Sequence, residues 1–199
     1  LEEMSEESVF QLARFFEEGE KETVRPLRDK TTDGYKLIAD FRTGSWDGWF
    51  SSGFAFGERP LMGEPVFEPE YGTLIEMQKG FASSRAYGAG VHGVLRSPTF
   101  ILEHDSIAIR AAGKGGQIRL IVDNFQVIRN PLYGNLEITL DNEEFQTFYI
   151  DLDLVKGKKA FFQFTPGNYN IHGSNVYHQD KESYLEVEYA YQFTGGEPE

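Results

Sequence analysis

The feature that most constrains this chain is a change in hydrophobic period at Tyr35. From there to Phe193, apolar and polar residues alternate in short stretches, separated by turn sequences such as Pro166-Gly167. A period of two is typical of half-buried strands in antiparallel sheets. Strands are expected over residues 73–77, 99–110, 117–129, 148–154, 159–164 and 185–193. About eight strands without recurring helices predict an all-β fold, an antiparallel β-sandwich or jelly roll.

Two local details follow from the same pattern. In the last strand, Glu186, Glu188 and Gln192 are expected on one face, and the apolar face is expected to carry Leu185, Val187, Tyr189, Tyr191 and Phe193. Between two of the strands, Gly113-Lys114-Gly115-Gly116 lacks the Walker spacing of a phosphate loop and no helix pattern follows it. A hairpin turn is therefore the favoured interpretation of this glycine-rich stretch.

The segment before Tyr35 differs in composition and period. Val9, Leu12, Ala13 and Phe16 recur at helical spacing after an N-cap-like Ser5. We therefore expect an N-terminal helix and connector over residues 1–34, a sandwich over 35–194, and a linker tail over 195–199. The sequence is interpreted as a piece of a longer protein or a processed form.

Charge and composition exclude several functions. The 32 acidic residues outnumber the 19 basic ones, for a net charge of −13. Nucleic acids and anionic membranes attract basic surfaces, so both are disfavoured as partners. The chain has no cysteine, which excludes disulfides and cysteine-based zinc sites. No apolar run reaches the length of a membrane span, so no membrane insertion is expected.

Catalytic motifs are absent from the sequence. There is no GxSxG nucleophile elbow and no HExxH helix. Asp151 and Asp153 lie two apart on one strand, and a solvated acidic face explains them better than a catalytic pair. A hydrolase would need two carboxylates facing each other in a cleft, which spacing along the chain does not reveal. We therefore expect the chain not to be an enzyme.

Two long stretches, 44–72 and 165–181, fit strands poorly and are rich in aromatic and amide residues. Long loops of this kind are often functional. Aromatic faces stack on sugar rings, and imidazoles and amides hydrogen-bond hydroxyls, so these residues are candidate ligand contacts. The candidates from these loops and the next turn are Trp46, Tyr133, Tyr169, His172, Tyr177 and His178. Trp49, by contrast, is expected to fill the core.

Two arginines and an asparagine complete the candidate set. Arg110 and Arg119 should lie opposite the apolar faces of their strands, and they would share one sheet face if those strands were neighbours. A guanidinium can fork onto hydroxyls or a carboxylate. The alternative is a surface ion pair for each with Asp123, Asp151 or Asp153. Asn124 offers an amide donor and acceptor.

Several segments together resemble a known kind of domain. They are Gly113–Phe125, Gly53-Phe54-Ala55-Phe56-Gly57 after Trp49, Gly93–Phe100 with its Ser97-Pro98, Ile107–Arg110, and Pro131-Leu132-Tyr133-Gly134. These resemble a galactose-binding-like jelly roll of the carbohydrate-binding type, as embedded in large bacterial surface or periplasmic proteins that carry cytochrome-c-like modules. The resemblance covers about residues 35–193.

The resemblance implies a β-sandwich with a non-catalytic binding role. Such folds often hold a structural calcium near the first and last strands, and the oxygen donors it would implicate here are Asp40, Asp47 and Glu188. No ligand residue is carried over from the family.

The function expected from these observations is a non-catalytic, lectin-like carbohydrate-binding module of a larger multidomain extracytoplasmic protein, binding a poly- or oligosaccharide. The expected partners are carbohydrate and the neighbouring domains of the parent protein. The alternative is a structural or interaction domain that positions those neighbours without a ligand of its own. Because fold alone does not fix function, the two are separated by whether the candidate surfaces are open or covered.

Overall fold

The computed structural model describes residues 34–62, 65–67, 74–77, 80–124, 136–167 and 181–195, and these are almost entirely β-structure. The elements are β1 (Tyr35–Asp40), the 3-10 turn η2 (Phe41–Thr43), β2 (Phe50–Gly53), β3 (Pro65–Phe67), β4 (Leu74–Met77), β5 (Ala82–Ser83), β6 (Gly93–Arg96), β7 (Phe100–Ile101), β8 (Ser106–Val122), β9 (Glu137–Asp151), β10 (Lys159–Thr165) and β11 (Tyr184–Phe193). The all-β prediction is confirmed. The expected N-terminal helix and residues 196–199 of the expected linker tail fall outside these ranges.

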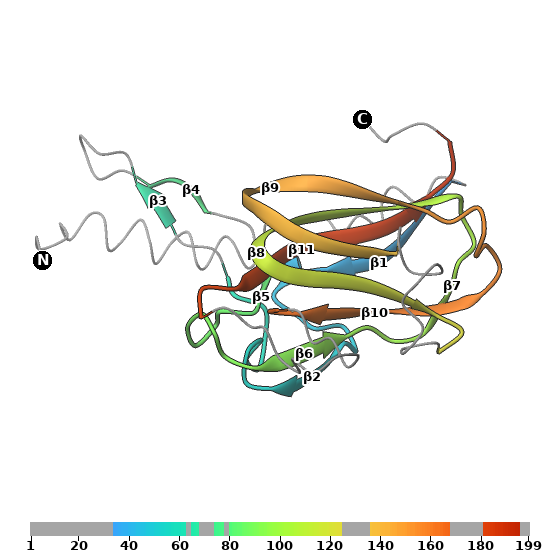
Figure 1. Ribbon diagram of the computed structural model, residues 1–199. Coiled ribbons are helices and arrows are strands. Elements are labelled where there is room, and N and C mark those ends of the chain that lie inside the picture. Colours follow the sequence, from blue (N-terminus) through green and yellow to red (C-terminus); the bar gives the residue numbers. More distant parts are fainter. Residues whose placement is uncertain are drawn as a thin grey trace, which may run out of the picture.

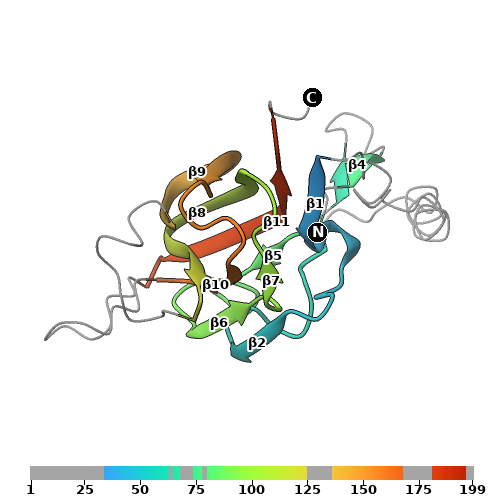
Figure 2. The same ribbon diagram turned by 90° about the vertical axis from the view of Figure 1, so that its right-hand side faces the viewer.

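The strands form one antiparallel sheet that curls into two layers. Its order is β1-β11-β8-β10-β6-β2, with β5 beside β11, β7 beside β10 and β9 beside β8, while β3 and β4 form a separate pair. Strand β9 pairs with β8 on one edge, and the other edge of β8 pairs first with β11 and then with β10. This change of neighbour divides the sheet into an upper layer of β9, β8, β11 and β1 and a lower layer of β10, β6 and β2 (Figures 1 and 2).

The core between the layers is rich in aromatic side chains. Trp49 is 6% exposed, and its ring centroid lies 5.0 Å from that of Phe41 and 4.9 Å from that of Phe164. Phe56 and Phe162 are fully buried in the same cluster. Burial of each such side chain contributes about 1.5–3 kcal/mol, so these rings are a main source of stability. The prediction that Trp49 fills the core is confirmed.

The glycine-rich stretch is not a hairpin turn, which corrects the sequence-based expectation. Gly113 to Gly116 lie inside β8, where its pairing with β9 shifts register and its neighbour changes from β11 to β10. A Cβ atom on Gly116 would lie 2.6 Å from both the Tyr184 oxygen and the Leu185 Cβ, and Gly115 has a φ of +68°. Glycine is needed here because the backbone of β11 approaches β8 too closely for a side chain. Residues 106–110 and 117–122 of the two expected strands therefore belong to one bent strand, β8, whereas Phe100 and Ile101 form the separate strand β7.

A β-bulge in β11 reverses the predicted alternation of its side chains. The register between β11 and β8 shifts between Val187 and Tyr189. Before the shift, Leu185 and Val187 face the core, and after it Ala190 belongs to the core cluster instead. A bulge adds one residue to a strand and so moves every later side chain to the opposite face. The tyrosines at 189 and 191, expected on the core face, consequently lie on the outer face of the sheet.

Candidate functional site

The outer face of the upper layer carries a group of aromatic side chains. We call Tyr35 of β1, Tyr149 of β9, and Tyr189, Tyr191 and Phe193 of β11 the aromatic face. Strand register places them together, because Tyr35 pairs with Phe193, Tyr191 pairs with Ala108, and Ala108 pairs with Tyr149. None of the five belongs to the central hydrophobic cluster, whereas Ile107 and Ile109, which alternate with Ala108, do.

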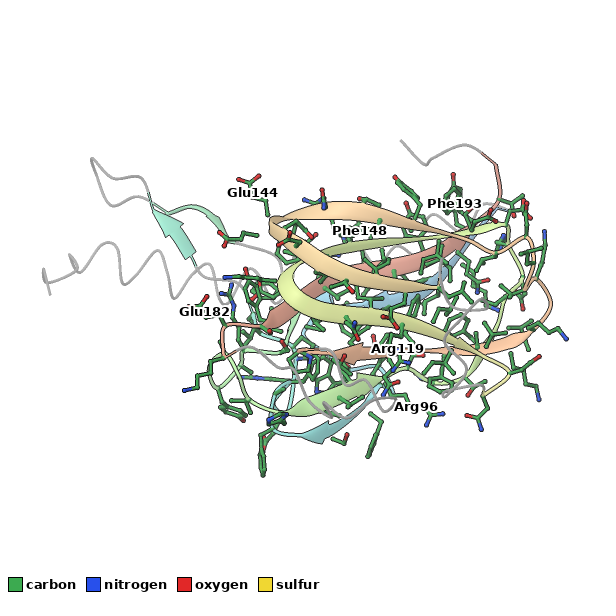
Figure 3. All side chains as sticks on the ribbon, viewed as in Figure 1. Arg96, Arg119, Glu144, Phe148, Glu182 and Phe193 are labelled. Carbon is green, nitrogen blue, oxygen red and sulfur yellow. The ribbon has the colours of Figure 1, made fainter. Side chains whose placement is uncertain are left out.

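The rings of the aromatic face form one connected surface. The Tyr191 centroid lies 6.0 Å from Tyr189, 5.8 Å from Phe193 and 6.1 Å from Tyr35, and the Tyr149 and Phe193 centroids are 6.1 Å apart. Tyr149 is 47% exposed, and Tyr35, Tyr189 and Tyr191 are half-buried. Phe193, labelled at the upper right of Figure 3, is nearly buried beneath these neighbours. The surface therefore offers accessible apolar ring faces next to phenol hydroxyls.

A row of polar side chains crosses the sheet at the Tyr189 end of the aromatic face. By register, Asp40 pairs with Tyr189, Tyr189 with Arg110, and Arg110 with Thr147. The two oxygens of Asp40 accept hydrogen bonds from the Nε and Nη2 atoms of Arg42, at 2.6 and 2.8 Å. Carboxylate, phenol, guanidinium and hydroxyl groups thus lie side by side on adjacent strands.

Both guanidinium groups of this row are held in place. The Arg42 Cζ atom lies 4.9 Å from the Tyr189 ring centroid, and the hydrogen bonds to Asp40 raise the pKa of the Arg42 guanidinium further above its usual range. The Arg110 Nε atom donates to Glu188 at 2.8 Å. Each positive charge is matched by a carboxylate, so this surface presents oriented hydrogen-bond donors without a net positive charge.

The structure separates the two arginines proposed from the sequence. Arg110 belongs to the polar row and its side chain is 35% exposed. Arg119 lies nine residues further along β8, beyond the bend at Gly113–Gly116 and in the half of the strand that pairs with β10. It is 8% exposed and pairs with Glu137 at 3.2 Å. Both arginines form ion pairs, as the alternative interpretation expected, but their partners are glutamates rather than Asp123, Asp151 or Asp153.

The two other described ligand candidates lie away from the aromatic face. Trp46 is half-buried and packs edge-on against Phe41, with centroids 5.6 Å apart. Its Nε1 atom is buried and has no hydrogen-bond partner among the described residues. Asn124 is exposed in the turn that follows β8, with a φ of +65°. Trp46 therefore lies at the edge of the core rather than on an open platform.

The remaining ligand candidates lie outside the described residues and stay predictions. They are Tyr133, Tyr169, His172, Tyr177 and His178.

The carboxylates proposed for calcium do not form a shared donor set. Asp40 is 4% exposed and gives both oxygens to Arg42, and Glu188 accepts from Arg110. Asp47 is exposed in a loop with a φ of +45°. Among the described residues, no group of three or more histidine or acidic side chains could hold a metal ion. Calcium binding stays a prediction, and these three residues do not fit it.

Sequence reasoning proposed none of the five residues of the aromatic face as ligand contacts. Tyr35 and Tyr149 are spaced as ordinary strand residues, and Tyr189, Tyr191 and Phe193 were assigned to the core side. One local signal was present: Ala190 lies between two tyrosines, and a small residue suits the close-packed side of a strand. That signal indicates the reversal of side-chain faces along β11 only when the bulge is already known.

No family model and no curated protein matches the chain. Solved structures do resemble it. One is the K3 cleaved adhesin domain of Lys-gingipain from Porphyromonas gingivalis w83, with 12% identity over 81% of this chain and 99% of that chain and a TM-score of 0.46. Another is a mutant of a family 29 carbohydrate-binding module, with 14% identity over 81% and 92% of the two chains and a TM-score of 0.41.

A third is a family 61 carbohydrate-binding module in complex with beta-1,4-galactotriose, with 14% identity over 79% and 98% of the two chains and a TM-score of 0.41. Carbohydrate-binding modules are thus among the structures that the chain resembles, as its sequence predicted. Identity and TM-score are low, so nothing about the ligand of this chain follows from them.

In the part of the chain that the structure describes, no helix is long and apolar enough to span a membrane.

Proposed function

We propose that this chain is a non-catalytic carbohydrate-binding module that holds a poly- or oligosaccharide on the aromatic face. The observation that carries the proposal is the connected surface of Tyr35, Tyr149, Tyr189, Tyr191 and Phe193, which is partly exposed on the outside of a sheet. Aromatic rings bind the apolar C–H face of a sugar, and phenols reach its hydroxyls.

The polar row gives this platform a means of selecting its ligand. Arg42 and Arg110 are anchored by Asp40 and Glu188, and their remaining N–H groups are oriented without a net positive charge. Fixed donors and acceptors favour hydroxyl groups at set positions. A neutral saccharide fits this arrangement better than a polyanion, because the chain has a net charge of −13.

The wider setting belongs to the same proposal. The module would serve a larger multidomain extracytoplasmic protein, holding a glycan near its neighbouring domains. Its non-catalytic character rests on the nature of the aromatic face, which is a stacking and hydrogen-bonding surface.

Calorimetry against a panel of neutral polysaccharides and oligosaccharides tests the proposal. The wild-type chain should bind at least one of them, and Tyr149→Ala should weaken that binding by about tenfold, equivalent to about 1.4 kcal/mol. Tyr87→Ala is the matched control, since Tyr87 is 65% exposed and outside the aromatic face. Equal effects of the two variants, or no binding to any glycan with and without calcium, would refute the proposal.

A structural or interaction domain is the second candidate function. It is favoured by large apolar side chains that are exposed outside the aromatic face: Phe50 is 67% and Phe54 is 75% exposed, on and beside the edge strand β2. Such residues are common in protein contacts. Crosslinking of this chain to neighbouring domains through β2, in a longer version of the protein that binds no glycan, would establish this function instead.

A further inference from the structure

A second row of side chains crosses the outer face of the lower layer. Phe50 of β2 pairs with Arg96 of β6, Arg96 pairs with Gln163 of β10, and Gln163 pairs with Arg119 of β8. Each alternates with a core residue, so the four side chains share the outward face. Figure 3 labels Arg96 and Arg119 close together in the lower half of the molecule, apart from Phe193 on the aromatic face.

Arg96 differs from most other arginines in the described part of the chain. Carboxylates pair with Arg42, Arg85, Arg110 and Arg119. The Arg96 side chain is exposed and makes no ion pair or hydrogen bond among the described residues. It packs instead against an aromatic ring, since its Cζ atom lies 3.7 Å from the centroid of Phe161. A guanidinium without a carboxylate partner in the described ranges is a conspicuous feature in a chain with a net charge of −13.

The contact with Phe161 fixes Arg96 in an orientation suited to a planar anion. Phe161 is 3% exposed, so the ring that supports the guanidinium is itself held by its surroundings. Stacking occupies one face of the guanidinium and leaves its N–H donors, which radiate in the plane, able to bind a partner. A carboxylate matches two of those donors at once.

The neighbours of Arg96 extend this site beyond a single charge. Phe50, 67% exposed on one side, offers an aromatic face of the kind that sugar rings stack upon. Gln163, partly buried on the other side, offers an amide donor and acceptor. Directly opposed residues on one sheet face have Cβ atoms within about 5.5 Å of each other, so Phe50 and Gln163 each lie next to Arg96 and within reach of a sugar unit bound there.

We propose that Arg96, Phe50 and Gln163 form a second ligand subsite, which binds the carboxylate of an acidic sugar unit. The saccharide nature of the ligand rests on the proposed function, whereas the carboxylate preference comes from Arg96. The acidic chain repels densely charged polyanions, so the fitting ligand carries isolated uronate units within a largely neutral saccharide.

Titration of the full chain with methyl glucuronoside, methyl glucoside and sodium acetate, followed by NMR, tests this subsite. The glucuronoside should shift the resonances of Arg96 and Phe50. The glucoside and acetate should each cause smaller shifts of these resonances at the same concentration. Arg96→Gln should weaken glucuronoside binding by about tenfold or more. Arg96→Lys keeps the charge but not the fork, and should also bind more weakly. Arg59→Gln is the matched control, because Arg59 is exposed and has no ion pair among the described residues.

The outcomes separate this proposal from the proposed function. Two independent sites would be supported if Tyr149→Ala weakened binding of the neutral glycan but not of the glucuronoside, and if Arg96→Gln weakened binding of the glucuronoside but not of the neutral glycan. Glucuronoside binding by a chain that binds no neutral glycan would support the subsite and refute the aromatic face. The subsite would be overturned if acetate and the glucuronoside bound equally well. It would also be overturned if Arg96→Gln, shown by thermal unfolding to be folded, bound the glucuronoside as tightly as the wild-type chain.

Discussion

The ion pair between Asp40 and Arg42 allows a direct test of what Asp40 does. The Asp40 side chain is 2% exposed and the Arg42 side chain 11%, and two hydrogen bonds of 2.6 and 2.8 Å join them. In Asp40→Asn the guanidinium keeps an oxygen acceptor but loses its counter-charge inside the protein. Removing one partner of a buried pair costs about 3–5 kcal/mol, and the retained acceptor places this variant at the lower end, near 3 kcal/mol.

For a domain of this size, a loss of about 3 kcal/mol lowers the melting temperature by roughly 6–12 °C. Scanning calorimetry in EDTA and in calcium measures the shift, and it should be the same in both. Glu182→Gln is the control, because its ion pair with Lys114 has exposed side chains and contributes less than about 1 kcal/mol. A shift below about 2 °C would show that the ion pair of Asp40 does not stabilise the fold. A shift present only with calcium would show that Asp40 serves as a calcium ligand. Either result would refute this reasoning.

Two further predictions concern the bend in β8 and the response to acid. Gly116→Ala should destabilise the fold by about 1–3 kcal/mol or more, because its Cβ would lie 2.6 Å from atoms of Tyr184 and Leu185. Gly34→Ala is the control and should change the unfolding free energy little, because a Cβ there would lie 3.5 Å from its nearest neighbour. Equal midpoints of urea unfolding for the two variants would contradict the bent strand. A hydrogen bond from Lys36 lowers the pKa of Glu103 in the folded state. The stabilisation that the ionised Glu103 provides is therefore present above about pH 4.5 and is lost as the pH falls. Glu103→Gln should accordingly reduce the decrease in unfolding free energy that acid causes. An unchanged decrease between neutral and acidic pH would contradict a stabilising role for the Lys36–Glu103 pair.

The strands and the core could be predicted because alternation and burial are local properties of the sequence. Trp49 was assigned to the core on the same basis, and the structure packs it between Phe41 and Phe164. Long apolar strands with flanking turns leave few other arrangements for so many aromatic residues.

The site was harder to predict because it depends on events between strands. The bulge between Val187 and Tyr189 reverses the faces of β11, and it is apparent only from the pairing of β11 with β8. The glycines of β8 have the composition of a turn, but they are needed for the approach of β11. Arg110 lies opposite the apolar face of its strand, as its spacing predicts, yet its partner Glu188 lies 78 positions away in the sequence.

The central claim, that a saccharide lies on the aromatic face, is tested most directly by mapping a bound glycan. NMR spectra of the chain with and without a saturating neutral oligosaccharide from the calorimetric panel would locate it. Tyr35, Tyr149, Tyr189 and Tyr191 should show the largest shifts, with little change at Tyr87. Shifts concentrated at Tyr87 or elsewhere, with those four tyrosines unchanged, would contradict the claim.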